Sequence, residues 1–170
     1  MSPFIFLILL VSCNKYSRLE PSAILSELSE KEKVARSYFF YPSIMRMVNL
    51  QDNPSFNEMI KKVEKVILYR LKREVTLGEL TVVRNRLEQE EAFEDYARVS
   101  LQGKKMFFLG KENPDHSVFI IPSEREYYVA DVMGQINFIA LNKMIQLFSA
   151  EANNENKQFL DIISLVGGQR

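Results

Sequence analysis

The sequence is poor in the residues that usually carry catalysis or bind metals. It contains no Trp, one Cys and one His in 170 residues. A single Cys excludes an internal disulfide and a Cys-based metal cluster, and zinc sites usually need more than the one imidazole that His116 supplies. Neither a P-loop nor a dinucleotide-binding glycine fingerprint is present. We therefore expect no metal, no cofactor and no enzymatic activity.

An excess of either charge is also missing. Lys plus Arg and Asp plus Glu both number 22, so the formal net charge is zero. A protein that binds nucleic acid normally carries a basic excess to neutralise phosphates, so nucleic acid is not an expected partner. The hydrophobic fraction of 46% and the charged fraction of 26% are typical of a folded globular chain of this length with one domain.

The N-terminus has the pattern of an export signal for a bacterial lipoprotein. An unbroken apolar run, Phe4–Val11, is far shorter than the roughly 20 residues that a transmembrane helix needs, and is typical of a signal peptide. The following Leu10-Val11-Ser12-Cys13 resembles a lipobox, in which the Cys receives diacylglycerol and the chain is cut before it. The sequence thus predicts a signal peptide over residues 1–12 and lipidation, palmitate included, at Cys13. The alternative is that Cys13 is buried in an ordinary hydrophobic strand.

The rest of the chain divides into a short tether and one domain. Residues 13–22 are mostly polar, contain Pro21 and would reach at most about 30 Å. They would therefore hold a domain of residues 23–170 close to a membrane surface.

That domain is predicted to be α+β. Helical spacing in residues 22–41 gives way to an aromatic run, and Phe56, Met59, Ile60 and Val63 have the spacing of a short helix. A β-rich segment, residues 66–71, precedes a helix that Thr76 can cap and that would bury Leu77, Leu80, Val83 and Leu87. Four short β-type runs follow, separated by turn signals, at residues 96–101, 105–109, 118–121 and 127–133. Short breaks require antiparallel neighbours, so these runs predict a meander. Two further helices are expected, one capped by Asn137 and one over about residues 155–166.

The order of these pieces resembles a known family, the small lipoproteins of Bacteroidota that carry domain of unknown function 4252. The resemblance lies in residues 53–60 (NPSFNEMI) before a strand at residues 63–69, in residues 93–96 (FEDY), and in residues 134–141 (GQINFIAL). It spans roughly residues 40–150. The family implies a location and an architecture, and it supplies no catalytic or binding residues.

Four groups of side chains are candidate sites. His116 beside Asp115 could be a general base, or simply a solvated residue of a hairpin turn, which is our prediction. The acidic residues between Glu88 and Asp95 could gather a cation, but their spacing matches no EF-hand, so a solvated helix end is expected. The aromatic run Tyr38–Tyr41, with Arg36 and Arg46, could lie against lipid headgroups, although a core role is expected. A basic stretch is expected to spread over different faces; it comprises Lys61, Lys62, Lys65, Arg70, Lys72 and Arg73.

Two functional hypotheses remain. The first is a non-catalytic interaction module in the cell envelope, anchored through Cys13, on the periplasmic face of the outer membrane and with an envelope protein as its partner. The second is a small-molecule binding protein or a hydrolase whose site does not depend on His, which would need a deep pocket with convergent polar groups.

Overall fold

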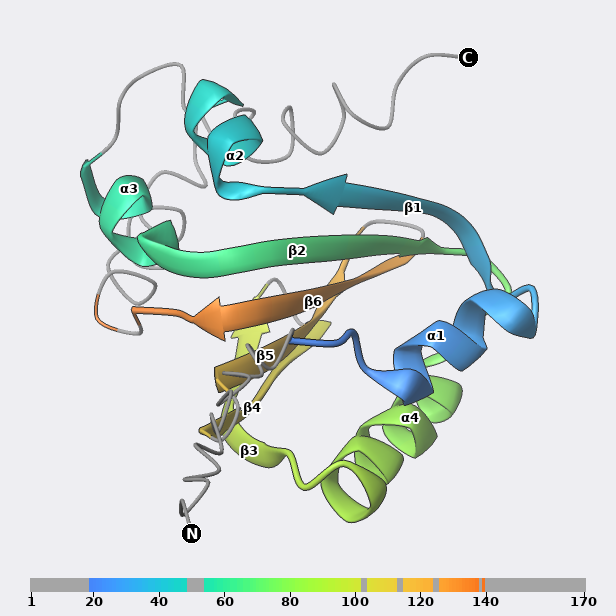
Figure 1. The fold of residues 1–170 in the computed structure, drawn as a ribbon. Coiled ribbons are helices and arrows are strands. Elements are labelled where there is room, and N and C mark those ends of the chain that lie inside the picture. Colours follow the sequence, from blue (N-terminus) through green and yellow to red (C-terminus); the bar gives the residue numbers. More distant parts are fainter. Residues whose placement is uncertain are drawn as a thin grey trace, which may run out of the picture.

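The fold is a single antiparallel sheet with helices packed on it, and we describe it from a computed structural model (Figure 1). The structure describes residues 19–48, 54–101, 104–112, 115–123, 126–137 and 139. Within these residues the sheet has six strands in the order β1-β2-β6-β5-β4-β3. The strands are β1 (Val34–Phe40), β2 (Lys62–Leu71), β3 (Glu94–Leu101), β4 (Lys104–Glu112), β5 (Asp115–Pro122) and β6 (Tyr127–Gln135), and the helices are α1 (Ala23–Glu30), α2 (Pro42–Val48), α3 (Pro54–Ile60) and α4 (Leu77–Glu90). The predicted α+β class with a mainly antiparallel sheet is confirmed.

The predicted four-strand meander is β3 to β6. Each of these strands pairs with the next along the chain, and each pair is antiparallel. The strand predicted over residues 66–71 forms the last part of β2. β2 pairs with β6, the last strand of the meander, and not with β3, the strand that follows it in the sequence. The sheet therefore has the meander on one side of β6 and a second pair, β1 and β2, on the other side.

Three details of the sequence prediction are wrong. The segment 34–40 is an edge strand, β1, where no strand was predicted. Val63 belongs to β2 and not to the helix before it, which ends at Ile60. Leu77 is 38% exposed at the start of α4, although its helical spacing predicted burial.

The helix α4 follows its predicted start signal closely. The Thr76 hydroxyl accepts a hydrogen bond from the Glu79 N–H, and the Glu79 carboxylate accepts one from the Thr76 N–H, which is a capping box. Its inner face buries the predicted Leu80, Val83 and Leu87. The capping box therefore fixes where α4 begins, and the spacing of these apolar residues sets the face that packs on the sheet.

Each face of the sheet has its own hydrophobic core. Helices α1 and α4 cover one face, where Leu25 and Leu87 pack with strand residues such as Val129 and Ile120. Helices α2 and α3 lie on the other face in Figure 1. There Met45 and Ile60 belong to a second cluster that also contains strand residues Leu68, Phe108, Phe119, Tyr128, Ala130 and Val132.

The end of β6 is shaped by Gly134. Its φ is +100°, and a Cβ atom on it would lie 2.4 Å from the backbone oxygen of Lys62. Here β6 passes an irregularity in β2 between Val63 and Lys65, and a side chain at position 134 would be excluded by both the φ angle and the contact. Just beyond, the Asn137 side-chain oxygen accepts from the Ile139 N–H at 3.1 Å, as expected of the predicted N-cap.

The remaining predicted helices, over residues 138–148 and 155–166, lie outside the described residues apart from Ile139. In the part of the chain that the structure describes, no helix combines the length and the apolarity needed to span a bilayer.

Candidate functional site

The site with the most unusual chemistry surrounds a buried carboxylate in the central strand β6. Asp131 has no exposed surface and follows the apolar residues Val129 and Ala130. A buried carboxylate is costly unless hydrogen-bond donors or a cation compensate it. Asp131 has two such partners, one from the neighbouring strand β5 and one from the N-terminal segment.

The first partner is His116. It is the second residue of β5, its side chain is 3% exposed, and its Nε2 contacts Oδ1 of Asp131. His116 is paired with Met133 in the ladder, which places it diagonally across from Asp131 on the same face of the sheet. The prediction of a solvated turn residue is therefore wrong. Its acidic partner is Asp131 and not the adjacent Asp115, because neighbours along a strand point to opposite faces.

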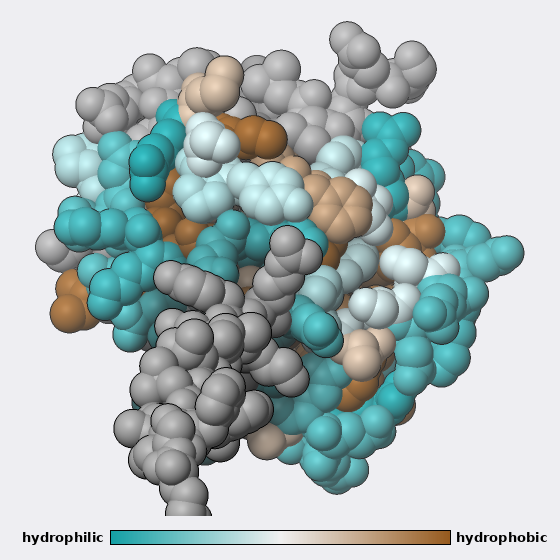
Figure 2. Space-filling view, in the orientation of Figure 1, coloured by the Kyte–Doolittle hydropathy of each residue, from teal (hydrophilic) through white to brown (hydrophobic). Residues whose placement is uncertain are grey.

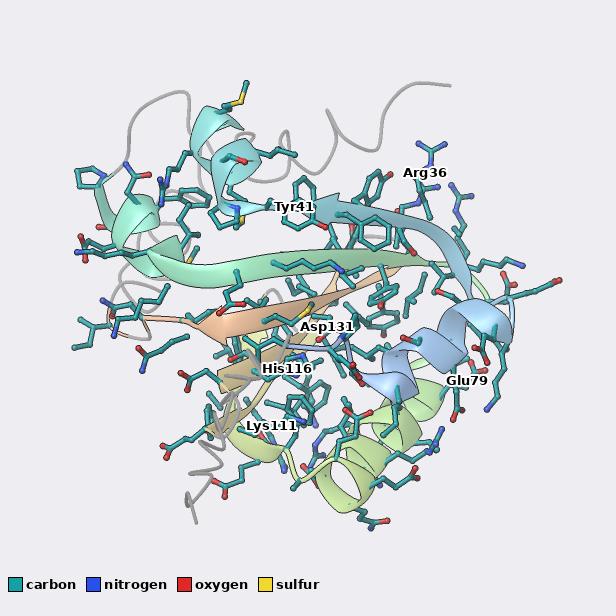
Figure 3. The ribbon with its side chains drawn as sticks, in the orientation of Figure 1. Arg36, Tyr41, Glu79, Lys111, His116 and Asp131 are labelled. Atoms are coloured by element: carbon teal, nitrogen blue, oxygen red, sulfur yellow. The ribbon has the colours of Figure 1, made fainter. Side chains whose placement is uncertain are left out.

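The second partner is the backbone of Ser22, whose N–H donates to Oδ2 of Asp131 at 3.0 Å. Ser22 is 2% exposed, and Leu19 packs against the same core. Both residues were assigned to the tether by sequence, so the segment that precedes α1 is already fixed on the sheet at these points. Figure 3 shows Asp131 and His116 close to each other, next to the segment that leads into α1.

Tyr69 lies in β2, on the side of β6 opposite to His116, and its pKa is affected by the charge of the same carboxylate. Burial raises the pKa of Tyr69 to about 12, with a further contribution from the negative charge of Asp131. Ile67 is the residue directly opposite Asp131 in the ladder, so Tyr69 takes the diagonal position. Asp131 is thus flanked by one polar ring on each side in an otherwise apolar core.

The N-terminus of α1 is held by a second acidic group, Glu91. Its Oε1 accepts hydrogen bonds from the Ser22 hydroxyl and from the Ile24 N–H, each at 3.0 Å. The Ser22 oxygen in turn accepts from the Leu25 N–H at 3.2 Å, so Ser22 is the N-cap of α1. Because Glu91 immediately follows α4, one carboxylate joins the end of α4 to the start of α1.

An aromatic ring and an amine close the outer side of the site. Ala92 has a φ of 57°, which turns the chain so that the Phe93 N–H reaches the Leu87 carbonyl at 3.0 Å. The Phe93 ring then meets the His116 ring edge-on, with centroids 5.1 Å apart. Lys111 also lies over the Phe93 ring, with its Nζ 4.6 Å from the ring centroid, and it donates to the Glu91 carbonyl at 3.4 Å.

A hollow of about 760 Å³ adjoins His116. It lies near the end of β4, the start of β5 and the end of β6. Its wall includes Tyr96, Lys111, Glu112, Asp115 and Gln135, so polar groups of both charges converge there. The Tyr96 ring lies so close to Gly110 that a Cβ on this glycine would be 2.4 Å from it. Burial, followed by the nearby Glu112 carboxylate, raises the pKa of Tyr96.

The hydrogen bonds of this site fix the segment before α1 on the sheet, and they leave Asp131 bonded on both of its oxygens. The lone pairs of Asp131 are directed to His116 and to the Ser22 N–H. Among the described residues that line the hollow, Ser117 has the single aliphatic hydroxyl, and as the residue after His116 it points to the opposite face. The imidazole of His116 also packs edge-on against the Phe93 ring, which adds to its fixed position in the site.

The other predicted groups are dispersed in the structure. Glu88 and Asp95 share Arg84, Asp95 also pairs with Arg98, and Glu90 pairs with Arg86, so these acidic residues are bound by arginines rather than gathered around a cation site. In the described part of the chain, no cluster of acidic, His or Cys side chains is arranged to hold a metal ion. The basic stretch is also spread out, since Lys61 pairs with Glu58, Lys62 with Gln135 and Arg70 with Glu126.

The aromatic run divides between core and surface. Tyr38 and Phe40 pack against the second core cluster, whereas Phe39 and Tyr41 are 55% and 50% exposed. The expected core role therefore applies to two of the four rings. Cys13 lies outside the described residues.

The fold and site define a six-stranded antiparallel α+β domain with a buried carboxylate that fastens its N-terminal segment. Comparisons with family models, with curated proteins and with solved structures found no match for the chain. The resemblance to the Bacteroidota lipoproteins therefore stays a prediction from sequence.

Proposed function

We propose that this chain is a non-catalytic interaction module of the bacterial cell envelope, held at the membrane by lipid on Cys13. The observation that carries the proposal is the way in which the start of the domain is secured. Leu19 packs on the core, and Ser22 is bonded to Asp131 in the central strand and to Glu91 at the end of α4. We expect a domain that is anchored through its N-terminus to need such an attachment, and here it consists of three contacts: the packing of Leu19 and the two hydrogen bonds of Ser22.

The tether is short in this proposal. Five residues lie between Cys13 and Leu19, and the six steps along the chain from one to the other span about 20 Å at full extension. The domain would then stay next to the bilayer, where we place it on the periplasmic side of the outer membrane. The family resemblance, which is part of the same proposal, gives the same location.

Replacement of Cys13 tests the anchor. The Cys13→Ala protein should leave the membrane fraction, and Ser17→Ala, a change of similar size in the same tether, should stay there. Mass spectrometry of the wild-type N-terminus should find a chain that begins at an acylated Cys13. A native peptide that still carries Met1, or a Cys13→Ala protein that stays membrane-bound in high salt, would refute the anchor.

The partner is tested by crosslinking in intact envelopes. The wild-type protein should yield a discrete crosslinked species with an envelope protein, and this species should weaken when Cys13→Ala removes the domain from the surface. Recovery that never exceeds the Cys13→Ala background would count against an interaction module.

The hollow beside His116 favours a second candidate, a small-molecule binding protein. Its wall combines Lys111 with Glu112 and Gln135, which could orient a polar ligand. A metabolite that raises the melting temperature of the wild-type protein, and fails to do so for Gln135→Ala, would support this candidate. A broad metabolite screen without any such stabilisation would argue against it.

A further inference from the structure

A group of exposed apolar side chains lies on β1 and α2, at the edge of the sheet. Phe39 is 55% exposed, Tyr41 50%, Ile44 43% and Met47 77%. These four lie within nine consecutive residues of the chain. Figure 2 shows apolar side chains gathered over the same two elements, in the upper part of the view. A compact patch of this kind on a folded domain usually marks a contact surface.

The same surface is basic. Arg36 and Arg46 are exposed, and the Nζ of Lys65 lies 5.4 Å from the centre of the Phe39 ring. No Asp or Glu occurs between residues 34 and 48, although the chain as a whole has equal numbers of both charges. Figure 3 shows Arg36 projecting away from the sheet at this edge. We call Arg36, Phe39, Tyr41, Ile44, Arg46 and Met47 the β1–α2 surface.

The exposure of Phe39 and Tyr41 is not needed to hold β1 in place. Tyr38 and Phe40, which alternate with them, pack on the second core cluster and attach the strand to β2. Met45 does the same for α2 and is 7% exposed. The elements are therefore secured by one set of side chains, while a second set is left to face outward.

We propose that the β1–α2 surface rests on the headgroup region of an anionic lipid bilayer. Aromatic rings and methionine favour the interface, while arginines bind anionic headgroups, and the surface carries both without a carboxylate to repel them. A partner strand added to β1 fits less well, because the strand is irregular between Val34 and Arg36. This proposal rests on the proposed function, in which the lipid anchor at Cys13 brings the domain to the membrane. A tether of about 20 Å then keeps one face of the domain within reach of the bilayer.

The absence of Trp gives a direct test. A Met47→Trp variant carries one fluorophore on the β1–α2 surface, and Val82→Trp carries one at a position of α4 that is 59% exposed, on a helix that covers the other face of the sheet. Both are prepared as full chains and bound to vesicles of equal parts phosphatidylglycerol and phosphatidylcholine with brominated acyl chains. We expect Met47→Trp to be quenched several times more strongly than Val82→Trp.

A second measurement removes charge. Each of Arg36→Gln and Arg46→Gln should lower partitioning onto these vesicles roughly fivefold, and high salt should have a similar effect. Arg98→Gln, at the opposite edge strand β3, removes the same charge and should change partitioning much less. Circular dichroism of every variant verifies the fold, which changes at exposed positions should preserve.

Equal quenching of the two tryptophans, or none for Met47→Trp, would overturn the proposal. So would an emission shift of Met47→Trp that depends on protein concentration without vesicles, because another copy of the chain would then cover the surface. These outcomes differ from failure of the anchor, which is seen as an unmodified Cys13 in the native protein and leaves the quenching contrast intact.

Discussion

At the scale of single residues, the sheet is organised around one carboxylate that sequence reasoning passed over. Asp131 stands alone in an apolar β run, and an isolated acid in such a run is a signal of a buried, partnered group. His116 was misjudged for the opposite reason. Asn113-Pro114-Asp115 is a turn signal, but a turn signal does not say which way the next side chain points once pairing begins. The partner of His116 lies 15 residues away and is fixed only by the register of β5 on β6.

Loss of this carboxylate should be costly. Asp131→Ala would leave the Ser22 N–H without its acceptor and His116 without its partner, both in a buried site. We expect the free energy of unfolding to fall by about 3 kcal/mol or more, measured by urea denaturation. Asp115→Ala, on the same strand but partly exposed, is the control and should cost less than about 1 kcal/mol. Similar losses for both variants would contradict the role given to Asp131.

At the scale of elements, the sequence was sufficient to predict those helices and strands whose formation depends on residues close together in the chain. The meander and the capped helix α4 were predictable because turn residues and the Thr76–Glu79 pair act within a few residues. The strand β1 was missed because its burial is partial and its run of rings has no clear period-2 pattern of polarity. The pairing of β2 with β6 could not be predicted either, since nothing near residues 62–71 specifies a partner so distant in sequence.

The ion pairs that join α1, α4 and the segment between α1 and β1 should make stability depend on acid. Hydrogen bonds from Arg86 and then Lys31 lower the pKa of Glu27 to about 2, and the Thr76 N–H and then Lys33 lower that of Glu79 to about 2. These carboxylates ionise more readily in the folded chain than at their ordinary value of 4.5, so they stabilise it above that pH. The stabilisation should be lost as the pH falls from about 4.5 to about 2.

Thermal melts over this pH range provide the measurement. The double variant Glu27→Gln, Glu79→Gln should lose less stability on acidification than the wild-type protein, while Glu30→Gln, at the exposed end of α1, should follow the wild-type curve. An unchanged acid slope in the double variant would show that these pairs do not determine it.

At the scale of the whole molecule, β6 is the strand on which the two halves of the sheet depend. It pairs with β2 on one side and β5 on the other, and nearly all of its side chains are buried. It also holds Asp131, to which the N-terminal segment is attached. By contrast, among the strands that the structure describes, β1 and β3 each have a pairing partner on one side only.

Amide hydrogen exchange should therefore be graded across the sheet. We expect the slowest exchange in β6 and β5, close to the limit set by global unfolding, and much faster exchange in the edge strand β1. Exchange mass spectrometry on peptides from these strands makes the comparison. The domain would not behave as described if peptides from β6 exchanged as fast as those from β1.

The pairing of β2 with β6 also has a kinetic consequence. Lys62 and Gln135, which are partners at one end of this ladder, are 73 residues apart in the chain. The meander can form early from short-range contacts, but the closure of so long a loop carries a high entropic cost. A newly made chain should thus pass through a stage in which the meander is formed but β2, which is rich in Val, Ile and Leu, has not yet paired with β6. We expect the protein to be most prone to aggregate at that stage.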